Sequence, residues 1–290
     1  MKIYSRDVQF EFFRLRFQFS VLDPIQFPAG KSGNMLRGAF GNLLRDAGCR
    51  CGTRSHSSYC RYARIFEPAA AENAGPSGLK TWPRPFVFRT HDLDGRRFEA
   101  GQPFSFDIHL FQVENPPVNA ICEALETFAT KGVGPGHGRA ALLSMEQLGV
   151  SIPLAADPQP CFTARVRFLT PTELKCGEQL APKPEFRVLF ARIRDRVSTL
   201  RALYGPGPLD LDFRGMGERS AGIEMTRCDL QHVDARRRSS RTGQVHPLGG
   251  FIGEAEYRGE LAEFLPFLRA ARWTGIGRQT VWGKGEIEVV

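Results

Sequence analysis

Strict alternation of apolar and polar residues predicts strands with one buried face in both halves of the chain. Residues 13–21 read Phe-Arg-Leu-Arg-Phe-Gln-Phe-Ser-Val, and the alternation just before them runs in the opposite phase. We therefore expect a β-bulge at Phe12-Phe13. The other segments with a strand pattern are residues 104–110, 140–148, 162–168, 249–257 and 286–290.

Apolar residues at helical spacing lie between these strands. A turn from Pro28 to Gly33 is expected to lead into the first helix, with Ser32 or Asn34 as its cap. Proline is favoured in the first helical turn, so Pro117 is expected to open the second helix. The apolar faces of the four expected helices fall within residues 35–44, 118–128, 186–200 and 261–268.

The two halves repeat one order of elements: strand, helix, strands, helix, glycine-rich loop, strand. Gly132-Val133-Gly134 takes the place in the first half that Gly275-Ile276-Gly277 takes in the second. A βαββαβ order that occurs twice predicts an α+β fold of two tandem ferredoxin-like (RRM-like) domains. We expect an N-terminal domain over residues 1–152, with a cysteine-containing loop insertion, and a C-terminal domain with a glycine-rich loop over residues 153–290.

The charge balance points to a nucleic-acid partner. The 290 residues carry a formal net charge of +8, and 32 of the 39 basic residues are arginine. Arginine offers a planar fork that matches phosphate, and it stacks on bases. A basic, arginine-dominated surface favours nucleic acid as the partner class. The alternative explanation is a GC-rich genome that prefers arginine codons.

Composition and cysteine usage favour a cytoplasmic protein without a membrane partner. No apolar run approaches the length of a membrane helix, and the first residues lack the apolar core of a secretion signal. The seven cysteines are an odd number scattered through a long chain, unlike a disulfide framework.

A glycine-rich loop precedes the last expected strand. Residues 275–285 have the form Gly-x-Gly, five residues, Gly-x-Gly. Glycines let backbone N–H groups approach a phosphate chain closely, although a turn required only for tight packing would have the same composition. The loop follows a helix and opens a strand, which is the reverse of the dinucleotide-binding motif. The candidate phosphate-binding residues are Gly275, Gly277, Arg278, Gly283, Lys284 and Gly285, with Arg139 after the first glycine-rich loop.

Residues 275–290 resemble the C-terminal glycine-rich signature of the RAMP superfamily of CRISPR-associated proteins. Further segments resemble one branch of it, the endoribonucleases that process precursor crRNA. These segments are the Leu-Arg-Gly stretch at residues 35–41, the Cys-x-Tyr…Phe-Glu-Pro stretch at residues 60–68, and residues 168–172, 186–204 and 239–241 in the C-terminal half.

This resemblance implies a tandem ferredoxin-like protein that binds a CRISPR repeat RNA and cuts it once to give crRNA. Family members need no metal for cleavage. The ribose 2′-OH attacks the adjacent phosphate and leaves a 2′,3′-cyclic phosphate and a 5′-OH. The reaction requires a base, an acid and a cation near the phosphate.

The catalytic residues are less clearly marked than the fold. The family often places its histidine in or near the first helix, but residues 1–45 contain none. Lys31 and Arg37 occupy that region instead. Two histidines lie beside other candidate sites: His137 is in the first glycine-rich loop, and His246 follows a basic stretch. These four residues are the candidate catalytic groups.

The densest basic stretch is an expected RNA-binding hairpin. Residues 235–244 include Arg236, Arg237, Arg238 and Arg241. Phosphate contacts supply most of the affinity for nucleic acid, and a basic hairpin could straddle an RNA stem. A solvated loop is the alternative.

The irregular segment from Cys49 to about Pro85 contains four potential zinc ligands. Cys49, Cys51, His56 and Cys60 offer three thiols and one imidazole, although structural sites usually begin with a wider Cys-x₂₋₄-Cys spacing. A zinc ion bound there would stiffen the loop rather than take part in cleavage.

Three classes of function remain open at this point. The first is the metal-independent endoribonuclease. The second is a non-cleaving RAMP subunit that holds guide RNA alongside other Cas effector subunits. The third is a zinc-dependent redox or regulatory module without affinity for RNA.

Overall fold

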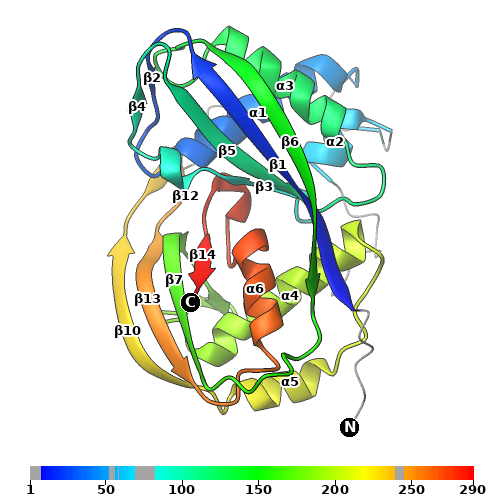
Figure 1. Cartoon of the computed structure of the whole chain (residues 1–290), viewed down its shortest axis with the longest axis vertical. Coiled ribbons are helices and arrows are strands. Elements are labelled where there is room, and N and C mark those ends of the chain that lie inside the picture. The colour runs from blue at the N-terminus through cyan, green and yellow to red at the C-terminus, as the bar shows by residue number, and fades with distance from the viewer. Residues whose placement is uncertain (1–7, 52–55, 58, 69–81, 239–244) are drawn as a thin grey trace. The chain divides into compact units, whose positions relative to one another are not determined.

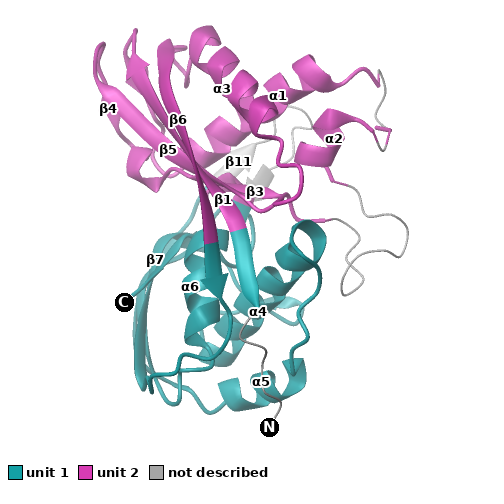
Figure 2. Cartoon of the chain, turned by 45° about the vertical axis from the view of Figure 1, so that its right-hand side comes forward, with its two compact units in different colours: residues 1–11, 151–280, 284–290 teal, residues 12–150, 281–283 magenta. Residues whose placement is uncertain are grey.

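The computed structural model describes residues 8–51, 56–57, 59–68, 82–238 and 245–290 (Figure 1). The chain divides into two compact units (Figure 2). Unit 1 combines the start of the chain, up to Glu11, with residues 151–280 and 284–290. Unit 2 comprises residues 12–150 and 281–283.

Unit 2 has the strand order of a ferredoxin-like fold. Its four-stranded sheet has the order β3-β5-β1-β6, and two helices separate the strands along the chain. The elements are β1 (Gln9–Val21), α1 (Ser32–Gly48), β3 (Phe86–Arg89), β5 (Pro103–Leu110), α3 (Val118–Lys131) and β6 (Ala140–Pro153). Smaller elements are β2 (Ile25–Gln26), α2 (Arg61–Phe66), the 3₁₀ helix η2 (His91–Leu93) and β4 (Arg97–Phe98).

Unit 1 repeats this topology. Its sheet has the order β10-β13-β7-β14, so the chain order of the strands across the sheet is the same as in unit 2. The main elements are β7 (Thr163–Thr172), α4 (Phe186–Tyr204), β10 (Glu224–Val233), β13 (Gly250–Arg258), α6 (Leu265–Thr274) and β14 (Ile287–Val289). Smaller elements are β8 (Lys175–Cys176), β9 (Gln179–Leu180), α5 (Phe213–Ser220), β11 (Arg236–Arg238), β12 (Val245–Pro247) and the 3₁₀ helix η3 (Thr280–Trp282). The predicted α+β class, with two tandem ferredoxin-like domains, is confirmed.

The units differ in three short segments from the halves expected at residues 1–152 and 153–290. Residues up to Glu11 and from Ser151 belong to unit 1, and residues 281–283 belong to unit 2. The physical reason is the length of β1 and β6, which have 13 and 14 residues and continue from one unit into the other. The change in alternation at Phe12-Phe13 falls where β1 passes between the units: Phe10 and Phe12 are buried in one phase, and Leu15 begins the other.

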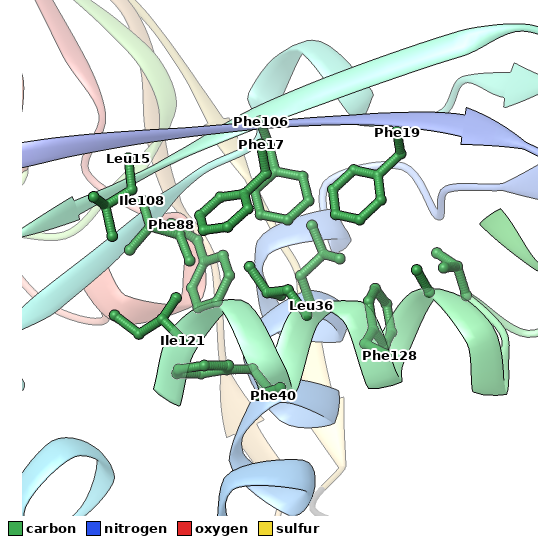
Figure 3. Close-up of a cluster of buried hydrophobic side chains, with 14 of the residues drawn as sticks. Leu15, Phe17, Phe19, Leu36, Phe40, Phe88, Phe106, Ile108, Ile121 and Phe128 are labelled. Carbon is green, nitrogen blue, oxygen red and sulfur yellow. The ribbon is translucent and has the colours of Figure 1, made fainter. Parts of the chain in front are cut away.

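An aromatic core holds the helices of unit 2 against one face of the sheet. Phe17 and Phe19 of β1 face Leu36 of α1 and Phe128 of α3 (Figure 3), and all four side chains are buried. The ring of Phe19 stacks on that of Phe104, with centroids 4.9 Å apart. Burial of each large apolar side chain contributes about 1.5–3 kcal/mol, so this alternation in β1 is sufficient to fix which face of the sheet is covered.

In unit 1 the core is formed by β13, α4 and the segment before α6. Phe190 of α4 packs edge-on against Phe264, with ring centroids 4.6 Å apart. Tyr257 of β13 is buried, and its hydroxyl donates to the carbonyl of Pro184 at 2.8 Å. Burial raises the pKa of the Tyr257 hydroxyl far above its ordinary value.

Two local expectations were wrong. The apolar spacing placed a helix from Leu261, but α6 begins at Leu265, and Pro266 occupies its first turn. Residues 49–85 were expected to be irregular, yet they contain the short helix α2. Proline favours a helix start over a helix interior, and six residues are too few to give a clear periodicity.

Candidate functional site

The start of α1 is fixed by a residue that lies far away in the sequence. Lys31 occupies the N-cap position, in place of the expected Ser32 or Asn34, and it is exposed. No side-chain hydrogen bond caps the helix there. Instead the N–H of Ser32 donates to the Asp94 carboxylate at 2.9 Å. Asp94 follows η2, so this contact brings η2 to the first turn of α1.

Arg37 of α1 is a buried cation. It is only 7% exposed, and its guanidinium carbon lies 4.4 Å from the ring centroid of Phe66 and 5.8 Å from that of Trp282. These distances are typical of cation–π contacts. The guanidinium of Arg37 thus packs against two aromatic rings, and its catalytic role stays a prediction.

The tip of the C-terminal glycine-rich loop also packs at the start of α1. A Cβ on Gly33 would lie 2.9 Å from the Cα of Gly283 and 3.0 Å from the carbonyl oxygen of Trp282. Gly283 itself has a φ of +75°. Only two glycines allow this backbone approach, which accounts for Gly33 and Gly283 together.

The first glycine-rich loop, with His137, reaches the same turn of α1. The N–H of Val133 donates to the carbonyl of Gly138 at 2.7 Å and closes the loop. A Cβ on Gly134 would lie 3.6 Å from Sδ of Met35, which is one helical turn after Lys31. His137 is exposed, with a φ of +50°. The loop that carries His137 therefore approaches α1 at Met35, which lies on the same side of the helix as Lys31.

His91 is a further candidate that the sequence did not single out. It begins η2, three residues before Asp94, and its Nε2 lies 3.0 Å from the Asp92 carboxylate. About a third of its side chain is exposed. A histidine next to an aspartate is a weak signal in a sequence, and only the Asp94–Ser32 contact shows that it lies near α1. We refer to Lys31, His91, His137 and residues 281–283 as the α1 start site.

The rest of the C-terminal loop is engaged with the end of β7. Gly275, Gly277 and Gly285 all have φ near +70°. The N–H of Gly285 donates to Pro171 O at 3.2 Å, and the N–H of Arg278 donates to Glu173 O at 3.0 Å. These backbone groups support the loop, as expected for glycines required by packing.

The two cations of that loop differ in exposure. Lys284 is only 3% exposed, and its role in phosphate binding stays a prediction. Arg278 is half-exposed, and its guanidinium lies 2.9 Å from the Glu173 carboxylate. Arg278 therefore remains a candidate for RNA contact, whereas Lys284 is an internal residue.

Arg139 lies at the start of β6 and pairs with Asp23. Its Nε donates to the Asp23 carboxylate at 2.6 Å, and its side chain is 60% exposed. The hydrogen bond from this guanidinium lowers the pKa of the Asp23 carboxyl below its ordinary value. Arg139 thus offers only part of its guanidinium to a further anion.

The expected basic hairpin exists in the backbone. β11 and β12 pair antiparallel, with Arg237 opposite His246, and they extend the β10–β13 hairpin. Arg241 falls within residues 239–244, which lie outside the described residues. The side chains of residues 236–238 and 245–247 also lie outside the described part of the structure. The RNA-binding role of Arg236, Arg237, Arg238 and Arg241 remains a prediction.

The four predicted zinc ligands come together. Their ligand atoms all lie within 4.8 Å of one another. The pKa of Cys51 is lowered to about 6, mainly by the backbone N–H of Ser57 and then by His56, whereas burial raises the pKa of Cys60.

The helix-free face of the unit 1 sheet carries paired charges. Arg165 lies 2.8 Å from Glu256, and Arg167 lies 3.6 Å from Glu254 and 3.5 Å from Glu288. RRM domains that bind RNA on the sheet use exposed aromatic residues there. This face has ion pairs in those positions instead.

Two ferredoxin-like units in tandem, with glycine-rich loops before their last strands, define the class of protein. Residues 166–287 match the family model of the CRISPR-associated endoribonuclease Cas6, and residues 10–162 match a model described as an N-terminal domain. The C-terminal match and the repeated fold identify the chain as a CRISPR-associated RAMP endoribonuclease of the Cas6 type, a type that processes CRISPR repeat RNA.

Solved structures agree with the fold. A Cas6 product complex is 16% identical, with a TM-score of 0.59, and the match covers 96% of this chain and 100% of that chain. Thermus thermophilus Cas6 is 15% identical, with a TM-score of 0.53 and coverage of 98% and 99%. A partial Cas6-RT-Cas1–Cas2 complex is 13% identical, with a TM-score of 0.57, and the match covers 97% of this chain and 46% of that chain. No curated protein matches the sequence.

Within the described residues, no helix combines the length and apolar character that crossing a membrane requires.

Proposed function

We propose that this Cas6-type protein cuts CRISPR repeat RNA without a metal ion and releases crRNA. The observation that carries the proposal is the α1 start site, where three contacts converge on one helical turn: Asp94 on Ser32, Gly134 near Met35, and Gly283 on Gly33. Lys31, His91 and His137 lie on the segments that make these contacts; Lys31 and His137 are exposed, and His91 is partly exposed. These are the residue types that the reaction needs.

The chemistry is an attack by the ribose 2′-OH on the adjacent phosphate. One imidazole takes the 2′-OH proton as the P–O2′ bond forms, and the other gives a proton to O5′ as the P–O5′ bond breaks. His137 and His91 take these two roles. Lys31 stabilises the negative charge that develops on the phosphate oxygens. The products are a 2′,3′-cyclic phosphate and a 5′-OH, and no metal is needed to balance charge or protons.

Arg37 has a positioning role in this proposal. Its contacts with Phe66 and Trp282 hold α2 and the tip of the C-terminal loop against α1. The RNA-binding residues are those of the basic hairpin and Arg278 in unit 1 and Arg139 in unit 2. Gly275, Gly277, Gly283 and Gly285 give the C-terminal loop its shape. The partners are CRISPR repeat RNA and crRNA, and further Cas effector subunits.

The test is single-turnover cleavage of an end-labelled repeat RNA by excess protein in EDTA. The wild type should cut at one position, and a 2′-deoxy substitution there should abolish the cut. His137→Ala, His91→Ala and Lys31→Ala should each slow cleavage by about 10²-fold or more while RNA binding is retained. His232→Ala, which removes an exposed histidine of unit 1, is the matched control and should cleave at the wild-type rate.

Three outcomes would contradict parts of the proposal. Cleavage that requires Mg²⁺ would exclude the metal-independent reaction. Binding without cleavage would favour the non-cleaving RAMP subunit. Full activity in the His137, His91 and Lys31 variants would move the catalytic role to His246.

A further inference from the structure

We propose that Cys49, Cys51, His56 and Cys60 bind one Zn²⁺ ion in a tetrahedral site of three thiolates and one imidazole. The proposal goes beyond RNA cleavage and is independent of it. Nδ1 of His56 lies 3.3 Å from Sγ of Cys49 and 3.6 Å from Sγ of Cys60. The standard Zn–S and Zn–N bond lengths give about 3.6 Å between sulfur and nitrogen ligands of one tetrahedral ion. His56 is thus spaced from Cys49 and Cys60 as around a metal, and all four ligand atoms lie within 4.8 Å of one another.

The second ring nitrogen of His56 faces a carboxylate, which is a common partner of the far nitrogen of a metal-bound imidazole. Nε2 of His56 lies 3.9 Å from the Glu67 carboxylate, whose other oxygen accepts a hydrogen bond from the Tyr62 hydroxyl at 3.0 Å. Carboxylates that hold the far nitrogen of a ligating histidine fix its ring and increase its basicity. This arrangement is an independent indication that Nδ1 is the ligand atom, and it gives Tyr62 and Glu67 a function.

The donor set selects zinc over the hard cations. Three thiols and an imidazole suit zinc, whereas Mg²⁺ and Ca²⁺ require oxygen ligands. The three cysteines are present as free thiols. All four coordination positions would be filled by protein, which is typical of structural zinc and leaves no position for water or substrate.

The site would lock two helices of unit 2 together. Cys49 is the C-cap of α1, and Cys60 is the N-cap of α2. α2 carries Phe66, which packs into the space left by Gly41 of α1 and lies under Arg37. Zinc would therefore fix α2 on α1 and keep the Phe66 ring in place under Arg37, without contacting the reacting groups.

Zinc content measures the proposal directly. Full-length protein, purified from zinc-supplemented cells without chelators, should contain about one zinc per chain by inductively coupled plasma mass spectrometry. Cys51→Ser and His56→Gln should lose most of it. Cys122→Ser and Cys176→Ser, which remove cysteines on α3 and β8, should keep it.

Two further measurements separate loss of metal from loss of fold. Replacement of zinc by Co²⁺ should give the visible absorption of tetrahedral cobalt and the thiolate charge-transfer band, and Cys51→Ser should weaken both. Glu67→Gln removes no ligand, so the protein should still bind zinc, with affinity about 10–100-fold lower in competition with a chelating dye. Wild-type protein that holds no zinc after reconstitution would overturn the proposal, as would wild-type zinc content in Cys51→Ser and His56→Gln.

Discussion

Several arginines of this chain donate hydrogen bonds to backbone carbonyls. The Nε of Arg84 donates to Phe66 O at 2.6 Å, that of Arg196 to Thr274 O at 2.9 Å, and that of Arg201 to Gln9 O at 2.9 Å. A carbonyl at the end of a helix or strand is a favourable acceptor for a charged donor. The arginine content therefore reflects internal support as well as affinity for nucleic acid.

Arg37 offers a test of the buried cation–π contact. Arg37→Lys replaces a flat guanidinium by a compact ammonium that stacks poorly on Phe66 and Trp282. We expect the free energy of unfolding to fall by about 1–2 kcal/mol, measured by urea denaturation. Arg45→Lys, on the exposed side of the same helix, should change it by less than about 0.5 kcal/mol. Equal effects of the two variants would show that the aromatic contact adds no stability.

The Asp23–Arg139 pair predicts an acid-sensitive contribution to stability. The pKa of Asp23 is lowered in the folded protein, so the pair stabilises the fold above the pKa of the unfolded aspartate, near 3.9. This stabilisation is lost as the pH falls through the lower folded pKa. Asp23→Asn should therefore show a shallower loss of stability than the wild type as the pH is lowered below about 4.

The matching variant on the other side of the pair completes this test. Arg139→Gln should flatten the same part of the pH profile, and the double variant should add nothing further. Urea denaturation at a series of pH values measures the slope, and an unchanged slope in Asp23→Asn would contradict the prediction.

At the scale of elements, α1 has two glycines with opposite roles. A Cβ on Gly33 would press against the backbone of Gly283, whereas a Cβ on Gly38 would meet nothing within 4 Å. Gly33→Ala should lower the free energy of unfolding by about 1–3 kcal/mol, because neither backbone can yield easily. Gly38→Ala should raise it by about 0.5–1 kcal/mol through helix propensity.

The same pair of variants tests the α1 start site. Gly33→Ala should also slow repeat-RNA cleavage, because it moves residues 281–283 away from the start of α1. Thermal unfolding and single-turnover cleavage measure the two effects. Stabilisation by both substitutions would show that residues 281–283 do not pack on α1 as described.

For the whole molecule, the net charge of +8 makes RNA binding dependent on salt. Replacement of Arg236, Arg237 and Arg238 by alanine should weaken binding and reduce the slope of log affinity against log salt by about 2. The control removes the same charge by replacing Arg45, Arg97 and Arg214, each of which is paired with a carboxylate. A slope that is unchanged in the hairpin variant would argue against contact by the hairpin.

The elements of the fold could be predicted because their signals are local. Alternation in β1 and β7 and helical spacing in α1, α3 and α4 record which face each element buries. Their order, repeated twice, was enough for the tandem ferredoxin-like topology. The cysteine cluster was visible for the same reason, since its four residues lie within 12 positions of one another.

The candidate site could be predicted only in part, because exposure and partners depend on residues distant in sequence. Lys31 and His137 were identified and are exposed, whereas Arg37 and Lys284 are buried, which their sequence context does not reveal. His91 was passed over, since its position depends on the contact between Asp94 and Ser32, 62 residues apart.

The sequence by itself thus determined the class of fold, the repeat and the residue types available for RNA chemistry. Only the tertiary structure decided which of those residues share a site. The physical reason is that periodicity encodes the direction in which each side chain points from its own element, while the neighbours of that side chain come from packing between elements.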